Sequence, residues 1–323
     1  MGENPTAATL IEIIIDDIPL NTKQRLIVEQ VLSAALSWNG AAYDASKRDQ
    51  IFLYVGGMSV SARAKSLLLL LLQWISFIEN MRSSSDLTAP TGSAADHIDG
   101  NTYHSSLGIS LAKTQKPTVS PRVRKLLSNK TIMFVDEISM VDQSTINDRC
   151  NIARSLDRSS TDLFGRIPVV IVMGDFYQFP PVKSRALWKE PRKGNAEDAK
   201  GLWIWHQFTN VIILHEQMRQ AEDPGFRDFL DQVRTTTCTE DDVAMLNSKV
   251  ITSLFTPELK DTTSIVTKNA LRHHLNRLQM EHFALSRGQS IYIFPARHSR
   301  TKSTSLSRAS PKQSPGLATP LPH

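Results

Sequence analysis

The sequence predicts an α/β fold built on a parallel sheet, and three apolar runs carry that prediction. The runs are 51–55 (Ile-Phe-Leu-Tyr-Val), 131–135 (Thr-Ile-Met-Phe-Val) and 167–173 (Ile-Pro-Val-Val-Ile-Val-Met). Short runs of β-branched and aliphatic residues are typical of strands that are buried on both faces of a parallel sheet. At 41% hydrophobic residues, the 323-residue chain can also bury a sizeable core around such a sheet.

Acidic and polar residues follow two of these runs. Asp136 and Glu137 come directly after the run 131–135, and Gly174-Asp175-Phe176-Tyr177-Gln178 follows the run 167–173. In open α/β sheets, ligands bind beyond the carboxyl ends of the strands. Carboxylates suit hard cations and can position a water molecule. The pattern therefore predicts a shared crevice for Mg²⁺ and an attacking water, as in a nucleotide hydrolase. Taken alone, an Asp-Glu pair after a strand is also typical of a solvated loop.

Two longer segments resemble a known family. Residues 135–141 (Val-Asp-Glu-Ile-Ser-Met-Val) and 174–182 (Gly-Asp-Phe-Tyr-Gln-Phe-Pro-Pro-Val) resemble motifs II and III of the Pif-type (petite integration frequency) superfamily 1 DNA helicases, especially those of Helitron transposons. The resemblance implies a RecA-like sheet of the P-loop NTPase type, and ATP hydrolysis with Mg²⁺ that drives 5′-to-3′ movement on single-stranded DNA. In that scheme Asp136 holds the metal, Glu137 positions the attacking water and Gln178 senses the γ-phosphate.

The phosphate-binding loop departs from the family pattern. After the strand 51–55 we expect a loop of the form G-x-x-x-x-G-K-[ST]. Lys65 and Ser66 match its end, where they would hold phosphate and Mg²⁺, and Gly57 can be its first glycine. However, eight steps separate Gly57 from Lys65 where the pattern has six, and Ala64 replaces the second glycine. Glycines let successive N–H groups curl around the phosphates, so the leading interpretation is a loop that has lost its ligand.

Two further residues match nucleotide-binding positions of the family. Gln24 matches the glutamine that reads the adenine edge, and the alternative is a surface residue of a helix. Arg219, in the segment His-Glu-Gln-Met-Arg, resembles the motif IV arginine that reaches the γ-phosphate. A guanidinium there would stabilise charge on the transferred phosphoryl group. The alternative for Arg219 is a surface arginine that pairs with Glu216 or Glu222.

Segments 88–95 and 100–105 resemble family segments that touch the DNA backbone. Small and hydroxylated residues at a helix start can donate hydrogen bonds to phosphates, and an aromatic side chain can stack on a base. The candidates are Thr91, Gly92, Ser93, Tyr103 and His104. Without the resemblance, this stretch predicts only a helix start. Just before it, 80–86 is polar where the family has a second apolar strand, so we expect that strand to be nearly absent.

The resemblance also implies a domain organisation. We expect an N-terminal extension (1–18), a first RecA-like ATP-binding domain (19–220), the truncated start of a second RecA-like domain (221–296) and a disordered basic Ser/Pro-rich tail (297–323). The tail holds five basic residues and no acidic one, which accounts for the whole net charge of +5. Composition therefore gives no argument for DNA binding by the rest of the chain. Two functions remain open: a DNA helicase, or a non-catalytic remnant that binds nucleic acid or protein weakly.

Other features exclude several classes of protein. Cys150 and Cys238 are far apart and have no Cys or His at ligand spacing, which argues against a disulfide framework or a zinc site. The longest apolar stretch, 67–78, is shorter than the roughly 20 residues that span a bilayer. The first residues lack the charged and then apolar pattern of a signal peptide, so we expect none. We therefore expect an intracellular, nuclear protein with neither a membrane nor a disulfide partner.

Overall fold

The structure is a computed structural model that describes residues 20–39, 50–57, 85–108, 120–127, 130–156, 162–215, 222–250, 262–292 and 294. The chain divides into two compact units, Met1–Ala244 and Met245–His323. The first unit extends past residue 220, where we expected the first domain to end, and the domain boundaries stay a prediction.

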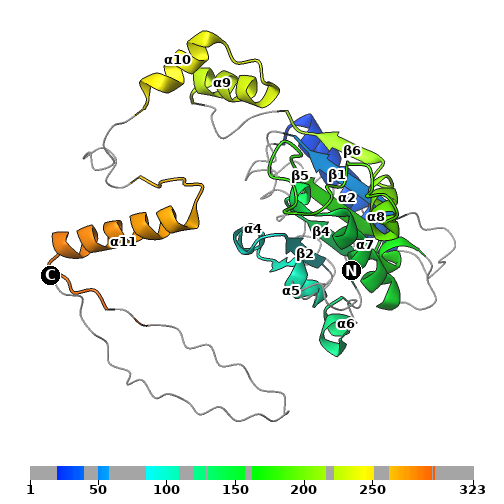
Figure 1. Ribbon diagram of the computed structural model, residues 1–323. Helices are drawn as coiled ribbons and strands as arrows, with labels where there is room; N and C mark the ends of the chain where they lie inside the picture. Colours follow the sequence, from blue (N-terminus) through cyan, green and yellow to red (C-terminus); the bar gives the residue numbers. More distant parts are fainter. Residues whose placement is uncertain are drawn as a thin grey trace, which may run out of the picture. The chain divides into compact units, whose positions relative to one another are not determined.

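A single parallel sheet organises the first unit (Figure 1). Its six strands lie in the order β3-β2-β4-β5-β1-β6. They are β1 (Ile51–Gly56), β2 (Ser85–Ala89), β3 (Asn101–Thr102), β4 (Ile132–Val135), β5 (Val169–Gly174) and β6 (Asn210–Ile213). The strands expected from the three apolar runs are confirmed as β1, β4 and β5, and every residue of β4 and β5 is buried.

Helices cover both faces of this sheet. Alternate strand residues such as Leu53 and Ile171 pack with α2 (Thr22–Asn39), and their neighbours Tyr54 and Val172 pack with α7 and α8. The other helices of the first unit are α4 (Gly92–His97), α5 (Tyr103–Leu107), α6 (Pro121–Leu127), η2 (Ile138–Met140), α7 (Gln143–Leu156), η3 (Leu163–Arg166), α8 (Ala196–Trp205) and α9 (Pro224–Thr235). Helix α10 (Glu240–Ser248) spans the border between the units, and α11 (Asn269–Ser286) belongs to the second.

The second strand of the sheet is present, so its expected near-absence is wrong. Strand β2 pairs in parallel with β4 on one side and with β3 on the other. Its polar residue Asp86 is buried, and its carboxylate accepts hydrogen bonds from Arg149 in α7 at 2.6 Å and from Ser106 in α5 at 3.1 Å. Because these partners satisfy the charge, a strand that lacks an apolar sequence can occupy the interior of the sheet.

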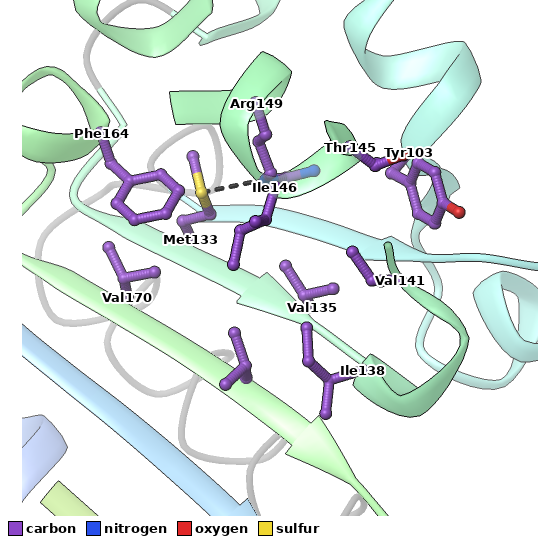
Figure 2. A pocket seen from close by; sticks show the side chains of 11 residues that line it. Tyr103, Met133, Val135, Ile138, Val141, Thr145, Ile146, Arg149, Phe164 and Val170 are labelled. Atoms are coloured by element: carbon purple, nitrogen blue, oxygen red, sulfur yellow. Dashed lines mark hydrogen bonds between the residues drawn. The ribbon is translucent and has the colours of Figure 1, made fainter. Parts of the chain in front are cut away.

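A small cavity lies between α7 and the sheet (Figure 2). Met133 and Val170 line it from the strands, and Ile146 and Arg149 line it from α7. The Nε of Arg149 donates to the sulfur of Met133 at 3.0 Å, and its Nη1 has no hydrogen-bond partner among the described residues. Burial lowers the pKa of this guanidinium, while the charge of Asp86 opposes that shift.

The expectations about the cysteines and about membrane-spanning segments can be compared with the described residues. Cys150 is a buried free thiol and Cys238 an exposed one. No helix in the described part of the chain is both long and apolar enough to cross a membrane. The apolar stretch 67–78 lies outside the described residues.

Candidate nucleotide site at the strand ends

Three strand ends meet at the carboxyl edge of the sheet. Strand β5 pairs with β4 on one side, where Val172 is opposite Val135, and with β1 on the other, where Gly174 is opposite Gly56. The residues that follow these strands are therefore neighbours. The structure thus brings together the ends of the three predicted strands, as the sequence pattern required.

The close approach of two of these ends depends on a glycine. Gly174 has φ +154°, and a Cβ added to it would lie 2.8 Å from the backbone nitrogen of Ile138 and 3.3 Å from the carbonyl carbon of Glu137. A side chain at this position would push the backbone after β4 away from the end of β5. Glycine is therefore required if the two predicted motifs are to pack against each other.

Asp136 and Glu137 differ in environment although they are adjacent. Asp136 is 0% exposed, and its Oδ1 accepts a hydrogen bond from the backbone N–H of Glu137 at 2.8 Å. Glu137 is half-buried and has φ 51° and ψ 48°, a left-handed conformation that is uncommon outside glycine. Such strained residues cluster at functional sites, where the surrounding structure holds them. The two consecutive carboxylates therefore differ in exposure, because Asp136 is fully buried and Glu137 is only half-buried.

A tight turn after β5 carries Gln178. The backbone N–H of Gln178 donates to the carbonyl of Asp175 at 2.9 Å, and the N–H of Tyr177 donates to the Asp175 carboxylate at 3.0 Å. Asp175 is buried, whereas Tyr177 and Gln178 are exposed. The buried Asp175 therefore holds an exposed turn through two hydrogen bonds.

Arg234 of α9 completes this turn, and sequence reasoning missed it. Its two terminal nitrogens donate to the two oxygens of Asp175 at 2.5 and 2.7 Å. Its guanidinium carbon also lies 4.2 Å from the centre of the Tyr177 ring. The partners are 59 positions apart in the chain, so no local pattern could have indicated this contact.

The predicted phosphate loop is described only at its first residue. Gly57 has φ +120°, and a Cβ there would lie 2.1 Å from the carbonyl oxygen of Leu214, just after β6. The backbone therefore requires glycine at this position independently of any phosphate. Lys65, Ser66 and Arg219 lie outside the described residues, and their roles stay predictions.

Gln24 belongs to a capping box at the start of α2. The Asn21 side chain accepts from the Gln24 N–H at 2.9 Å, and the Gln24 side chain accepts from the Asn21 N–H at 3.1 Å. This reciprocal pair satisfies two backbone donors that a helix start otherwise leaves free. Gln24 is only 8% exposed, so it is not the surface residue of the alternative interpretation. The pattern Asn-x-x-Gln was a signal for this cap in the sequence.

The first three DNA-contact candidates form the start of α4. Thr91 caps the helix, and its hydroxyl accepts from the backbone N–H of Ala94 at 3.2 Å. Gly92 and Ser93 are exposed, and a Cβ on Gly92 would meet nothing within 4 Å. This helix start is therefore open to solvent.

The two aromatic candidates differ in accessibility. Tyr103 is 7% exposed and packs in the core on the α7 side, and burial, assisted by the charge of Asp142, raises its pKa to about 12. His104 is half-buried, with its ring centre 4.4 Å from that of Tyr103. Of the two residues, His104 is the more exposed, and a base contact stays a prediction.

The sequence matches a known protein family. The model of the PIF1-like helicase family matches residues 19–243. The chain is 34% identical over 168 residues to an ATP-dependent DNA helicase PIF1 from Danio rerio, and 26% identical over 239 residues to an ATP-dependent DNA helicase Pif1 from Psychrobacter. These alignments cover 50% and 71% of this chain, but only 25% and 35% of the relatives.

Solved structures show the same fold. A crystal structure of Pif1 helicase from Candida albicans matches with a TM-score of 0.62 and 24% identity, over 82% of this chain and 55% of that one. A Bacteroides Pif1 bound to single-stranded DNA matches with a TM-score of 0.56 and 20% identity, over 81% and 57% of the two chains. The sheet with its flanking helices is thus similar to the RecA-like domains of these helicases.

Proposed function

The chain belongs to the PIF1-like helicase family, and on that premise we propose that its sheet domain is the nucleotide-binding lobe of an ATP-dependent 5′-to-3′ DNA helicase. The observation that supports the proposal is the packing of the backbone of the Asp136-Glu137 turn against Gly174, because the turn that carries Gln178 begins directly after Gly174. In this arrangement a triphosphate would bind beyond the ends of β1, β4 and β5.

The residues present fit a magnesium ion that arrives with its nucleotide. Among the described residues, no group of three or more His, Cys, Asp or Glu side chains could hold a metal by itself. Mg²⁺ is usually bound by one or two carboxylates together with substrate phosphates. Asp136 and the hydroxyl of Ser66 would supply such an oxygen set. When bound, the ion would neutralise charge on the transferred phosphoryl group.

Other side chains would orient the attacking water and bind the nucleotide. Glu137 would orient the attacking water and accept its proton, and Gln178 would contact the γ-phosphate from the neighbouring strand end. Lys65 and Arg219 would place positive charge near the phosphates, and Gln24 would read the adenine edge. These roles are carried over from the family motifs.

Single-stranded DNA is the proposed partner. The open start of α4, with Thr91, Gly92 and Ser93, would donate to backbone phosphates, and His104 would lie beside a base. A relative from Bacteroides has been solved with single-stranded DNA bound. With DNA as its substrate, the protein would act in the nucleus.

A second candidate function follows from the altered loop 57–66. The lengthened spacing and the alanine before Lys65 remove features that a phosphate nest needs. We therefore propose that this chain does not hydrolyse ATP in response to DNA, and that it binds nucleic acid or protein without catalysis.

The deciding experiment measures ATP hydrolysis with and without single-stranded DNA. It compares the unmodified chain with a variant in which the loop is restored to Gly-Gly-Thr-Gly-Lys-Ser, and each also carries Glu137→Gln as a matched control. Binding of a fluorescent ATP analogue is followed in parallel. We expect DNA-stimulated turnover only from the restored loop, and its loss with Glu137→Gln.

The other outcomes separate the two functions. Hydrolysis by the unmodified chain that disappears with Glu137→Gln would refute the non-catalytic interpretation and support the helicase lobe. If the restored chain neither binds the analogue nor turns over, the nucleotide site itself is refuted, whatever the chain does with DNA.

A further inference from the structure

Arg234 makes a charged contact to the turn that carries Gln178. Both terminal nitrogens of its guanidinium donate to the Asp175 carboxylate, a bidentate arrangement that fixes direction as well as distance. The side chains of Arg234 and Asp175 are 20% and 4% exposed, so water screens this pair much less than a surface pair. A charge pair in this setting can hold a backbone segment in place.

At its start the turn is held by Phe176, whose ring centre lies 5.5 Å from that of Tyr54 and 5.2 Å from that of Trp205, but the residues that follow are less enclosed. Tyr177, Gln178 and Phe179 are all exposed. Two backbone N–H groups donate hydrogen bonds to Asp175 and define the turn. The N–H of Gln178 donates to the Asp175 carbonyl, and the N–H of Tyr177 donates to the Asp175 carboxylate. Any rotation of the Asp175 side chain would therefore break the bond to the Tyr177 N–H and loosen the turn.

The guanidinium also contacts the turn directly. It lies 4.2 Å from the centre of the Tyr177 ring, within the range of a cation–π interaction. Arg234 thus touches the residue that precedes Gln178 as well as the aspartate that anchors the turn.

We propose that Arg234 is a positioning residue that fixes the Gln178 turn through Asp175 and Tyr177, and that it ties this turn to α9. The proposal rests on the proposed function, because the fixed turn matters to catalysis only if Gln178 contacts the γ-phosphate. Helix α9 ends shortly before Ala244, where the first unit ends. A shift of α9 would therefore be transmitted to the residue that senses the nucleotide.

Amide hydrogen exchange tests the positioning without requiring ATP. Arg234→Met keeps the length of the side chain and removes its charge, and Arg234→Lys keeps the charge but loses the bidentate geometry. Arg227→Met is the matched control, because Arg227 lies on the same helix and, in the described part of the chain, its one ion pair is with its exposed neighbour Asp228 at 3.4 Å. Peptides from β4 and β5 report whether the sheet stays intact.

We expect Arg234→Met to speed exchange of the Tyr177 and Gln178 amides at least about tenfold, with a smaller increase for Arg234→Lys and none for Arg227→Met. Asp175→Asn should produce much of the same increase, and adding Arg234→Met to it should contribute little more. Unchanged exchange at 175–179 in Arg234→Met, with the sheet peptides intact, would overturn the proposal.

A kinetic readout then separates this proposal from the proposed function. In the loop-restored chain, Arg234→Met should lower kcat about tenfold or more while leaving the KM for ATP nearly unchanged. Equal losses in the Arg227→Met control would contradict a specific role. If no variant hydrolyses ATP but the exchange result holds, the turn is positioned as proposed and the proposed function fails.

Discussion

The guanidinium of Arg149 lies 2.6 Å from the carboxylate of Asp86, and neither side chain is more than 4% exposed. This ion pair joins α7 to the interior strand β2, and Ser106 of α5 donates a second hydrogen bond to the Asp86 carboxylate. It therefore connects the helix that follows the Asp136-Glu137 turn with the helix that carries His104.

Replacing one partner of the Arg149–Asp86 pair should lower the stability of the fold. Arg149→Met leaves a buried carboxylate without its cation, and we expect the free energy of unfolding to fall by about 3–5 kcal/mol. The double variant Asp86→Leu with Arg149→Met replaces both charges by apolar groups and should be more stable than either single variant. Urea unfolding of all four proteins measures this cycle. Additive losses would show that the two side chains do not act as a pair.

Gly174 should not tolerate a side chain. Gly174→Ala places a methyl group against the backbone of Ile138 in a conformation that favours glycine, so we expect a loss of at least about 2 kcal/mol of stability. Gly225→Ala is the control, because its added Cβ would meet only Asp223 at 3.7 Å within α9. That variant should be neutral or more stable by up to about 1 kcal/mol. Thermal unfolding distinguishes them, and equal effects would contradict the close approach.

The two roles of Gln24 can be separated. Gln24→Glu keeps an oxygen that accepts from the Asn21 N–H, so stability should change by less than about 0.5 kcal/mol. It removes the NH₂ donor, so in the loop-restored chain the preference for ATP over other nucleoside triphosphates should be lost. Asn21→Ala should instead cost about 1 kcal/mol and leave that preference unchanged. A retained preference in Gln24→Glu would argue against the adenine contact.

Asp142 should make stability depend on pH. Burial alone would raise the pKa of this carboxyl, but hydrogen bonds from Ser184, Thr145 and Ser144 outweigh it, and the pKa lies below its ordinary value of 3.8. The unfolded state therefore binds the proton more readily. The contribution of Asp142 is fully present above that ordinary value and is lost as the pH falls through the lowered pKa of the folded state.

Unfolding in urea from about pH 7 to about pH 3 tests this sign. Asp142→Asn keeps a side chain that can cap α7 but cannot titrate, so its stability should fall less steeply in the acidic part of this range. The difference between wild type and variant should shrink as the pH falls. A difference that grows with acid would contradict the lowered pKa.

The strands that carry the motifs were predictable because each is apolar along its whole length. Their burial on both faces demands such residues, so 51–55, 131–135 and 167–173 stand out in the sequence. Strand β2 was not predictable, because its sequence, Ser-Asp-Leu-Thr-Ala, is not apolar along its whole length. It forms because its neighbours in the sheet pair with it and because Arg149, 63 positions away, neutralises Asp86. Context of this kind overrides local propensity.

The structure of the candidate site was predictable where consecutive residues form it. The Asp136-Glu137 turn and the segment 174–178 each lie at one strand end, so a short motif describes them. The contribution of Arg234 comes from a helix far along the chain and could emerge only from the fold. Gln24 shows a third case, since the same residue matches a family position and a capping box, and the sequence pattern supports both.

The Tyr54 hydroxyl donates to the carbonyl of Gly174, and 120 positions of chain separate the two. Strand β1 is synthesised before both strands that flank it, β5 and β6, and more than 100 residues separate it from them. Until β5 and β6 have been synthesised, both edges of the apolar strand β1 lack their partners and can pair with other nascent chains. Folding of this domain should therefore be slow and late, and most vulnerable to aggregation while translation is unfinished.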